Sequence, residues 1–181
     1  MEFSTAFILA QISGLLATVA QVIGVQFKKK THILIFVIIN SIFFTISFWL
    51  LGAYSGAVVC ALGVLISVAI YFIERSGRRV NLPIVLVFFV IELAAIILTY
   101  STPWDILPGA ASIFWLISIL QSNENNLRFL LIISHVCWAV YGVINMAYTS
   151  VLDDFFTITS SAIAMIRYRK VKNGKTKNNK R

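Results

Sequence analysis

The sequence predicts an all-α polytopic membrane protein with seven transmembrane helices, arranged as two parallel three-helix repeats and one linker helix (3+1+3). Three observations lead to this prediction. Of the 181 residues, 59% are hydrophobic and 12% are charged, with a mean hydropathy of +0.89, a composition that cannot cover an ordinary water-exposed surface. Lys and Arg occur only after every second apolar segment. The second half of the chain also repeats features of the first half.

The apolar segments have the lengths that membrane spans require. A helix needs about 20 residues to cross the roughly 30 Å of hydrocarbon in a bilayer. We predict spans at residues 5–27, 31–51, 55–73, 82–100, 106–120, 127–146 and 151–169. The fifth is short unless it includes Trp104 and Asp105 at one end and Gln121 at the other. Because the connections are too short for a further domain, residues 1–170 are expected to form a single membrane domain.

The basic residues predict the orientation of the chain. They are Lys28, Lys29, Lys30, Arg75, Arg78, Arg79 and Arg128, followed by eight residues between Arg167 and Arg181. Short loops rich in Lys and Arg stay in the cytoplasm, so the N-terminus is expected outside and the C-terminus inside. The net charge of +8 therefore indicates topology and attraction to anionic lipid headgroups, not nucleic-acid binding. Residues 171–181 are expected to form a disordered basic tail.

An internal repeat accounts for the 3+1+3 arrangement. The turn at residues 53–55, Ala-Tyr-Ser, recurs at residues 147–149 as Ala-Tyr-Thr, an offset of 94. The same offset pairs Asn40 with Ser134, Phe44 with Trp138, and Cys60 with Asp154. We therefore expect one repeat at about 5–75, a linker helix at about 82–100 and a second repeat at about 104–170. Because three spans end on the opposite side of the membrane from where they begin, two repeats of the same orientation must be joined by an odd number of linker helices.

Polar groups within a bilayer are costly, so those in the predicted spans are candidates for function. The proposed pocket lies between the two repeats and is lined by Asn40, Phe44, His135, Trp138, Asp154 and Ser161. Aromatic rings would enclose a small solute while the amide and the carboxylate bind its polar edges.

Each of these candidates has a structural alternative. Asn40 and His135 can bond neighbouring helices, and the small hydroxyls can serve close helix packing. Asp153 is expected to cap the first turn of the seventh span, whereas Asp154 lies deeper and is the better candidate for a solute or proton. Glu92, near the centre of the fourth span, must be protonated, paired with another copy of the chain, or turned inward to a hydroxyl, and a structural or oligomer contact is favoured over transport.

Chemistry other than binding has little support. The chain has no sequence motif typical of a catalytic, metal or phosphate site. We therefore do not predict an enzyme or a cofactor. The expected partners are the lipid bilayer, a small solute and, through Glu92, a second copy of the chain.

Several short motifs resemble a known family. They are Ala10-Gln11 with Gly14, the turn Phe27-Lys28-Lys29, the run from Phe48 to Tyr54, Trp138, and Ile166-Arg167. In these the chain resembles the bacterial inner-membrane family named for YgjV, which implies a multi-pass protein of the inner membrane. More distantly, its layout is similar to that of the SWEET and PnuC transporters, which carry small neutral solutes between two three-helix bundles. Unlike SWEET-like proteins, it has a proline placed as a hinge only at Pro108.

Two functions from different classes are compatible with these residues. The leading hypothesis is a transporter or facilitator for a small polar, uncharged solute. The alternative is a non-transporting membrane scaffold or regulatory subunit, with Glu92 and the basic tail as its contacts. A water-accessible cavity that reaches His135 and Asp154 would favour transport, and a dry core in which these side chains bond to each other would favour the scaffold.

Overall fold

The computed structural model describes residues 4–178 except 25–26, 28–29, 79 and 122–123. Within this part of the chain all regular structure is helical, which confirms the predicted all-α class. The elements are α1 (Thr5–Gly24), α2 (Lys30–Leu50), α3 (Tyr54–Arg75), α4 (Leu82–Thr99), the short 3-10 helix η1 (Pro103–Asp105), α5 (Ile106–Ile119), α6 (Glu124–Ile144) and α7 (Tyr148–Asn178).

Five of these helices are long and apolar enough to cross a membrane: α1, α2, α3, α4 and α6. The other two are α5, which has 14 residues, and α7, which contains adjacent carboxyls at Asp153 and Asp154. Many large apolar side chains point away from the protein, and Leu98 on α4 is 85% exposed. Such extensive exposed apolar surface is typical of a protein surrounded by lipid.

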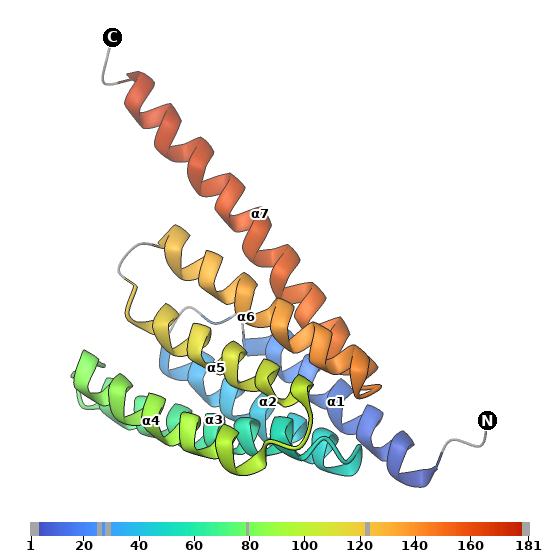
Figure 1. The fold of residues 1–181 in the computed structure, drawn as a ribbon. Helices are drawn as coiled ribbons and strands as arrows, with labels where there is room; N and C mark the ends of the chain where they lie inside the picture. The colour runs from blue at the N-terminus through green and yellow to red at the C-terminus, as the bar shows by residue number, and fades with distance from the viewer. Residues whose placement is uncertain (1–3, 25–26, 28–29, 79, 122–123, 179–181) are drawn as a thin grey trace.

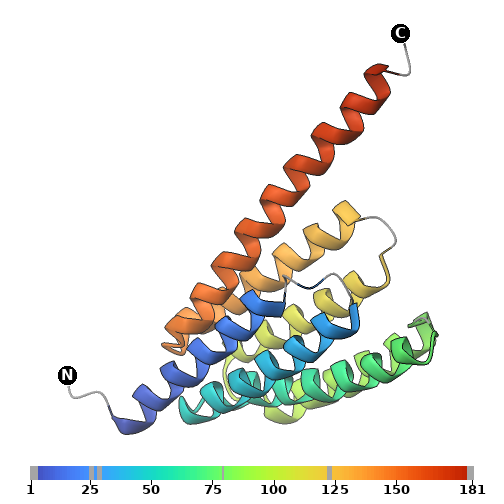
Figure 2. The same cartoon turned by 180° about the vertical axis from the view of Figure 1, so that it is seen from behind.

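The helices pack in two groups (Figures 1 and 2). In the first group α2 packs between α1 and α3, and in the second α6 packs between α5 and α7. The groups meet where α1 contacts α7 and where α3 contacts α5. Helix α4 packs against α3 and α5 at the margin of the bundle. The C-terminal ends of α1, α3, α5 and α7, which lead into the basic segments, lie toward the same end of the bundle. We call this the basic end.

The turns after α2 and α6 have the same hydrogen bonds. Ala53 N donates to Phe48 O at 2.9 Å, and Ala147 N donates to Gly142 O at 2.8 Å. The preceding residues, Gly52 and Met146, both have positive φ, at 74° and 56°. This is the Schellman arrangement, which satisfies the last carbonyl groups of a helix through one left-handed residue. Met146 occupies this position without the freedom of a glycine.

Helix α7 differs from the prediction at both ends. It begins at Tyr148, so its first turn contains no acidic residue, and the expected capping role of Asp153 is wrong. At the other end it continues beyond the bundle as helix through Asn178 (Figures 1 and 2). The expected disorder from residue 171 is therefore not found for residues 171–178, and residues 179–181 lie outside the described part. Lys and Arg are good helix formers, and no proline follows Pro108 to stop the helix.

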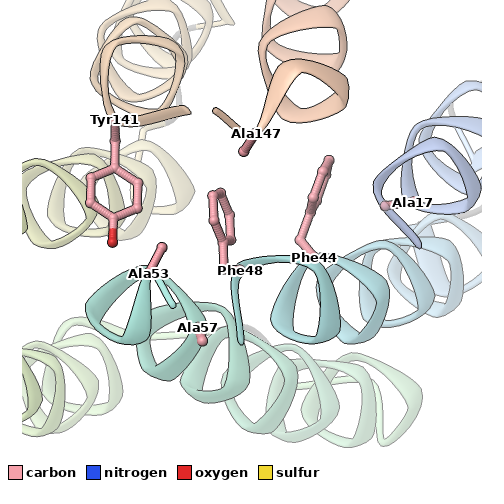
Figure 3. Close-up of a cluster of buried hydrophobic side chains, with 7 residues drawn as sticks. All are labelled: Ala17, Phe44, Phe48, Ala53, Ala57, Tyr141 and Ala147. Carbon is pink, nitrogen blue, oxygen red and sulfur yellow. The ribbon is translucent and has the colours of Figure 1, made fainter. Parts of the chain in front are cut away.

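One cluster of buried side chains joins the two groups near the end opposite the basic end. It is formed by Ala17, Phe44, Phe48, Ala53, Ala57, Tyr141 and Ala147 (Figure 3). Because Ala53 and Ala147 belong to the turns after α2 and α6, this cluster lies beside those turns. A second cluster packs α4 against its neighbours and contains Leu34, Ile66, Ile70, Val85 and Leu116.

Candidate functional site

A cavity of about 160 Å³ lies between the two helix groups and is lined by residues from every α-helix except α4. One water needs about 10–15 Å³ of such space, so the cavity has room for on the order of ten waters or a small solute. Five of the six predicted site residues line it: Asn40, Phe44, His135, Trp138 and Asp154. Ser161 is buried but does not line the cavity, because it lies two turns, or about 10 Å, beyond Asp154 along α7.

His135 and Asp154 are bonded to each other across α6 and α7. His135 Nδ1 lies 2.7 Å from Asp154 Oδ1, and Asp154 is only 3% exposed. An ionised carboxylate can only accept, so with Asp154 ionised the imidazole donates from Nδ1 and turns Nε2 toward other partners. Both side chains line the cavity, so this polar pair forms part of its wall.

Asp153 is the principal site residue that the sequence analysis missed. It lines the cavity next to Asp154 and is 5% exposed. Within the described part of the chain, Asp153 Oδ1, Asp154 Oδ2 and Ser67 Oγ have no hydrogen-bond partner. All three residues line the cavity. Buried polar atoms are nearly always satisfied, so the unsatisfied carboxyl oxygens on α7 and the unsatisfied Ser67 hydroxyl on α3 indicate places for a ligand or water.

Aromatic rings occupy the side of the cavity nearest the turns after α2 and α6. Phe48 stacks on Trp138 with ring centroids 5.6 Å apart and an interplanar angle of 24°. Phe44 packs against Phe48 at 6.1 Å, and Tyr141 contacts both Phe48 and Trp138. The Tyr141 hydroxyl lies 2.8 Å from Ser55 Oγ and accepts from Gly56 N at 3.1 Å. This end of the cavity is therefore closed by packed rings, and α6 is tied to the first turn of α3.

Comparison with known families identifies the chain. The model of the Imp-YgjV family, described as a bacterial inner membrane protein, matches residues 8–172. The chain belongs to this family. The match spans every residue that lines the cavity, and it confirms the resemblance drawn from the sequence motifs. A search of curated proteins and a search of solved structures each found no match.

Besides the Tyr141 bonds, polar contacts of Gln11 and of Asp105 connect the helix groups of this Imp-YgjV protein at the closed end. Gln11 Nε2 donates to Met146 O at 2.8 Å, and Thr149 donates to Gln11 Oε1 from its backbone nitrogen and its hydroxyl, each at 3.3 Å. The second contact is Ser55 Oγ to Asp105 Oδ1 at 2.5 Å. The first ties α1 to α7 and the second ties α3 to the start of α5.

Asp105 is held as a carboxylate by a dense set of donors. Its Oδ2 accepts from Thr102 N at 2.6 Å and from Ser101 N at 3.0 Å, in addition to the Ser55 contact. Partial burial raises the pKa of Asp105, but the hydrogen bonds outweigh this effect and hold the pKa below its ordinary value of 3.8. The contact between α3 and the start of α5 is therefore made by a charged acceptor.

Asn40 and Ser134 make matching contacts between helices. Asn40 Nδ2 donates to Ala17 O at 3.0 Å, and Ser134 Oγ donates to Ala111 O at 2.8 Å. In each case the two partners are 23 residues apart in the sequence. Asn40 thus has the helix-bonding role given as its alternative, and it also lines the cavity.

Glu92 on α4 points inward. It is completely buried and accepts a hydrogen bond from Ser112 Oγ, and Ser112 lines the cavity. Of the three alternatives for this carboxyl, the structure has the one in which it turns to a hydroxyl of the same chain. Its other oxygen, Oε2, is without a hydrogen-bond partner in the described part of the chain.

Proposed function

We propose that this protein is a transporter or facilitator that moves a small polar solute across the bacterial inner membrane. The observation that carries the proposal is the cavity between the helix groups, whose wall contains the bonded pair His135 and Asp154 beside Trp138. Ionisable groups within a membrane protein mark substrate or ion pathways. A concave site with apolar walls and a few convergent polar groups is the usual form of a small-molecule site.

In this proposal the two groups are parallel repeats, α4 is the linker and all seven helices span the membrane. The turns after α2 and α6 have the same hydrogen bonds at an offset of 94 residues. The same offset relates the Asn40 contact to that of Ser134, and the Gln11–Thr149 contact to the Asp105–Ser55 contact. Transporters built from repeats bind their substrates at the repeat interface near the middle of the bilayer.

The proposed orientation has the basic end in the cytoplasm, following the distribution of Lys and Arg. The opposite end is closed by the rings around Phe48 and by the Gln11 and Asp105 contacts. Toward the basic end the cavity wall includes Gln21 and Trp115, which are half-buried. The structure then corresponds to a state open to the cytoplasm, and transport requires the closed end to open.

The membrane scaffold is retained as the second candidate because His135 and Asp154 are bonded to each other, as that function predicts. Cys60 separates the two functions, since it lines the cavity, whereas the second cysteine, Cys137, does not. A small membrane-impermeant thiol reagent is added to intact cells and to inverted membrane vesicles that contain the Cys137→Ala variant, with Cys60→Ala as the matched control.

A transporter in the proposed state is labelled at Cys60 from the cytoplasmic side, and a transported solute slows this labelling. Candidate solutes are screened by this protection and then tested for uptake into proteoliposomes. If Cys60 stays unlabelled from both sides in folded protein and no candidate solute is taken up into proteoliposomes, the scaffold is the correct function.

A further inference from the structure

We infer that the solute is a small organic cation, a protonated amine carried on a compact apolar body. This inference rests on the proposed function and specifies the chemical class of its solute. The wall of the cavity contains two carboxyls and one imidazole, and the described residues that line it include no Lys or Arg. The sequence led to an expected uncharged solute and, separately, to a capping role for Asp153, but Asp153 lines the cavity and adds a second carboxyl to its wall.

The two carboxyls require either a proton or a positive partner. Asp153 and Asp154 are adjacent on α7 and both are more than nine-tenths buried. Two neighbouring carboxylates in a region of low dielectric cannot both stay ionised without compensating positive charge. His135, when protonated, compensates one of them through the bond to Asp154 Oδ1. With both carboxyls ionised and the imidazole protonated, the wall holds one net negative charge, which matches a monovalent cation.

The unsatisfied atoms define where the cationic group would bind. Asp153 Oδ1 and Asp154 Oδ2 belong to adjacent residues of α7 that line the cavity, and neither atom has a hydrogen-bond partner within the described residues. An ammonium group has N–H donors and no acceptor. It therefore supplies what this wall lacks, and hydrogen bonds from a charged donor to a carboxylate are stronger than those between neutral groups.

The aromatic part of the wall suits the remainder of such a solute. Phe44, Phe48 and Trp138 all line the cavity, and Phe48 stacks on Trp138. Aromatic faces attract cations and accept apolar groups. An amine with a small hydrocarbon or aromatic body can therefore satisfy both parts of the wall at once.

The charge belongs to one helix group only. At the offset of 94 residues Asp153 corresponds to Val59, Asp154 to Cys60 and His135 to Ser41, and all six residues line the cavity. The first group thus places neutral side chains where the second places ionisable ones. We expect the ammonium to bind beside the carboxyls of α7 and the apolar body to lie against the rings of Phe44, Phe48 and Trp138.

The test compares amines with neutral molecules of the same shape. Benzylamine is paired with benzyl alcohol, 3,3-dimethylbutylamine with 3,3-dimethylbutanol, and NaCl serves as the inorganic arm at constant ionic strength. Dissociation constants are obtained from the concentration dependence of the thermal midpoint of the purified full-length protein. The variants are Asp153→Asn and Asp154→Asn. Glu74→Gln is the matched control, because its carboxyl lies in the last turn of α3 and does not line the cavity.

We expect at least one amine to bind the wild type about tenfold or more tightly than its neutral counterpart, and each Asp variant to reduce that affinity by about tenfold or more. Glu74→Gln should keep wild-type affinity. The comparison of amine with neutral molecule uses the wild type alone, so it decides the question even if a variant does not fold.

Other outcomes overturn the inference in distinguishable ways. If neutral molecules bind as well as amines and the Asp153 variant binds them unchanged, the solute is not a cation but the proposed transport function stands. Stabilisation by NaCl without any response to amines would identify an inorganic cation site instead. If nothing in the panel binds and Cys60 is also inaccessible, both the inference and the proposed function fail.

Discussion

The hydroxyl of Tyr141 should stabilise the closed end of the cavity measurably. It accepts from Gly56 N at 3.1 Å and lies 2.8 Å from Ser55 Oγ, and the side chain is 1% exposed. In Tyr141→Phe the ring packing is retained, but the buried Gly56 N–H loses its partner. An unsatisfied buried donor costs about 1–3 kcal/mol. Ser55 adds little to this cost because it keeps its bond to Asp105.

The free energy of unfolding can be measured by titrating the purified protein in mild detergent with SDS and following tryptophan fluorescence. Tyr54→Phe is the matched control, since Tyr54 is 57% exposed and exposed substitutions usually stay within about 0.5 kcal/mol of wild type. Ser55→Ala completes a double-mutant cycle with Tyr141→Phe, for which we expect a coupling of at least about 0.5 kcal/mol. If Tyr141→Phe is as stable as Tyr54→Phe, or if the cycle is additive, the hydroxyl does not make these bonds.

Three further predictions concern other parts of the molecule. At Gly109 an added Cβ would overlap the Ile96 side chain, so Gly109→Ala should lower the free energy of unfolding by about 1–3 kcal/mol. Adding Ile96→Ala should recover part of this loss. If it recovers nothing, α4 and α5 do not meet at these residues. The pKa of Asp105 is lower in the folded protein than its ordinary value of 3.8. The Asp105 carboxylate therefore stabilises the fold fully above about pH 3.8, and this stabilisation is lost as the pH falls through the lower pKa of the folded state. The difference in thermal midpoint between wild type and Asp105→Asn should therefore shrink below about pH 4, and a difference that is independent of pH would contradict the charged contact. In a background without native cysteines, Ser101→Cys should react with an impermeant maleimide in intact cells and Ser76→Cys only after permeabilisation; the reverse pattern would invert the proposed orientation.

The helices could be predicted from the sequence because the thickness of the bilayer sets the length of each apolar segment. The ends of α7 could not. Its start depends on Met146 adopting a left-handed conformation that is more usual for glycine. Its end depends on basic residues for which helix and disorder are both compatible with a polar composition. The predicted start of α7 lay three residues too late, at residue 151 in place of Tyr148. Asp153 was therefore assigned to the first turn as a cap, whereas it belongs to the cavity wall.

The site was predicted in outline because mid-membrane polar residues are few and costly. Asn40, His135 and Asp154 were identified on that basis and line one cavity. Their partners could not be identified, because the rotation of each helix about its axis decides whether His135 meets Asp154 or a backbone carbonyl. Ser161 was wrongly grouped with them as a lining residue. Its equivalent at the offset of 94, Ser67, does line the cavity, so the two groups do not expose equal lengths of α3 and α7 to it.

The side chains of α7 explain why composition alone does not identify it as a membrane span. Asp153 and Asp154 are buried on the cavity side, whereas Leu152, Phe155 and Phe156 are exposed large apolar residues. A helix with carboxyls toward a protein cavity and aromatic rings toward the outside can lie in hydrocarbon, since charged groups within membranes face the bundle interior or a water-filled cavity. Its mean hydropathy is lowered by the residues that build the site. This distribution supports α7 as the proposed seventh span, and it ties the topology to the function. The membrane would tolerate two adjacent carboxyls on this helix only if the cavity supplies them with water, protons or a cation.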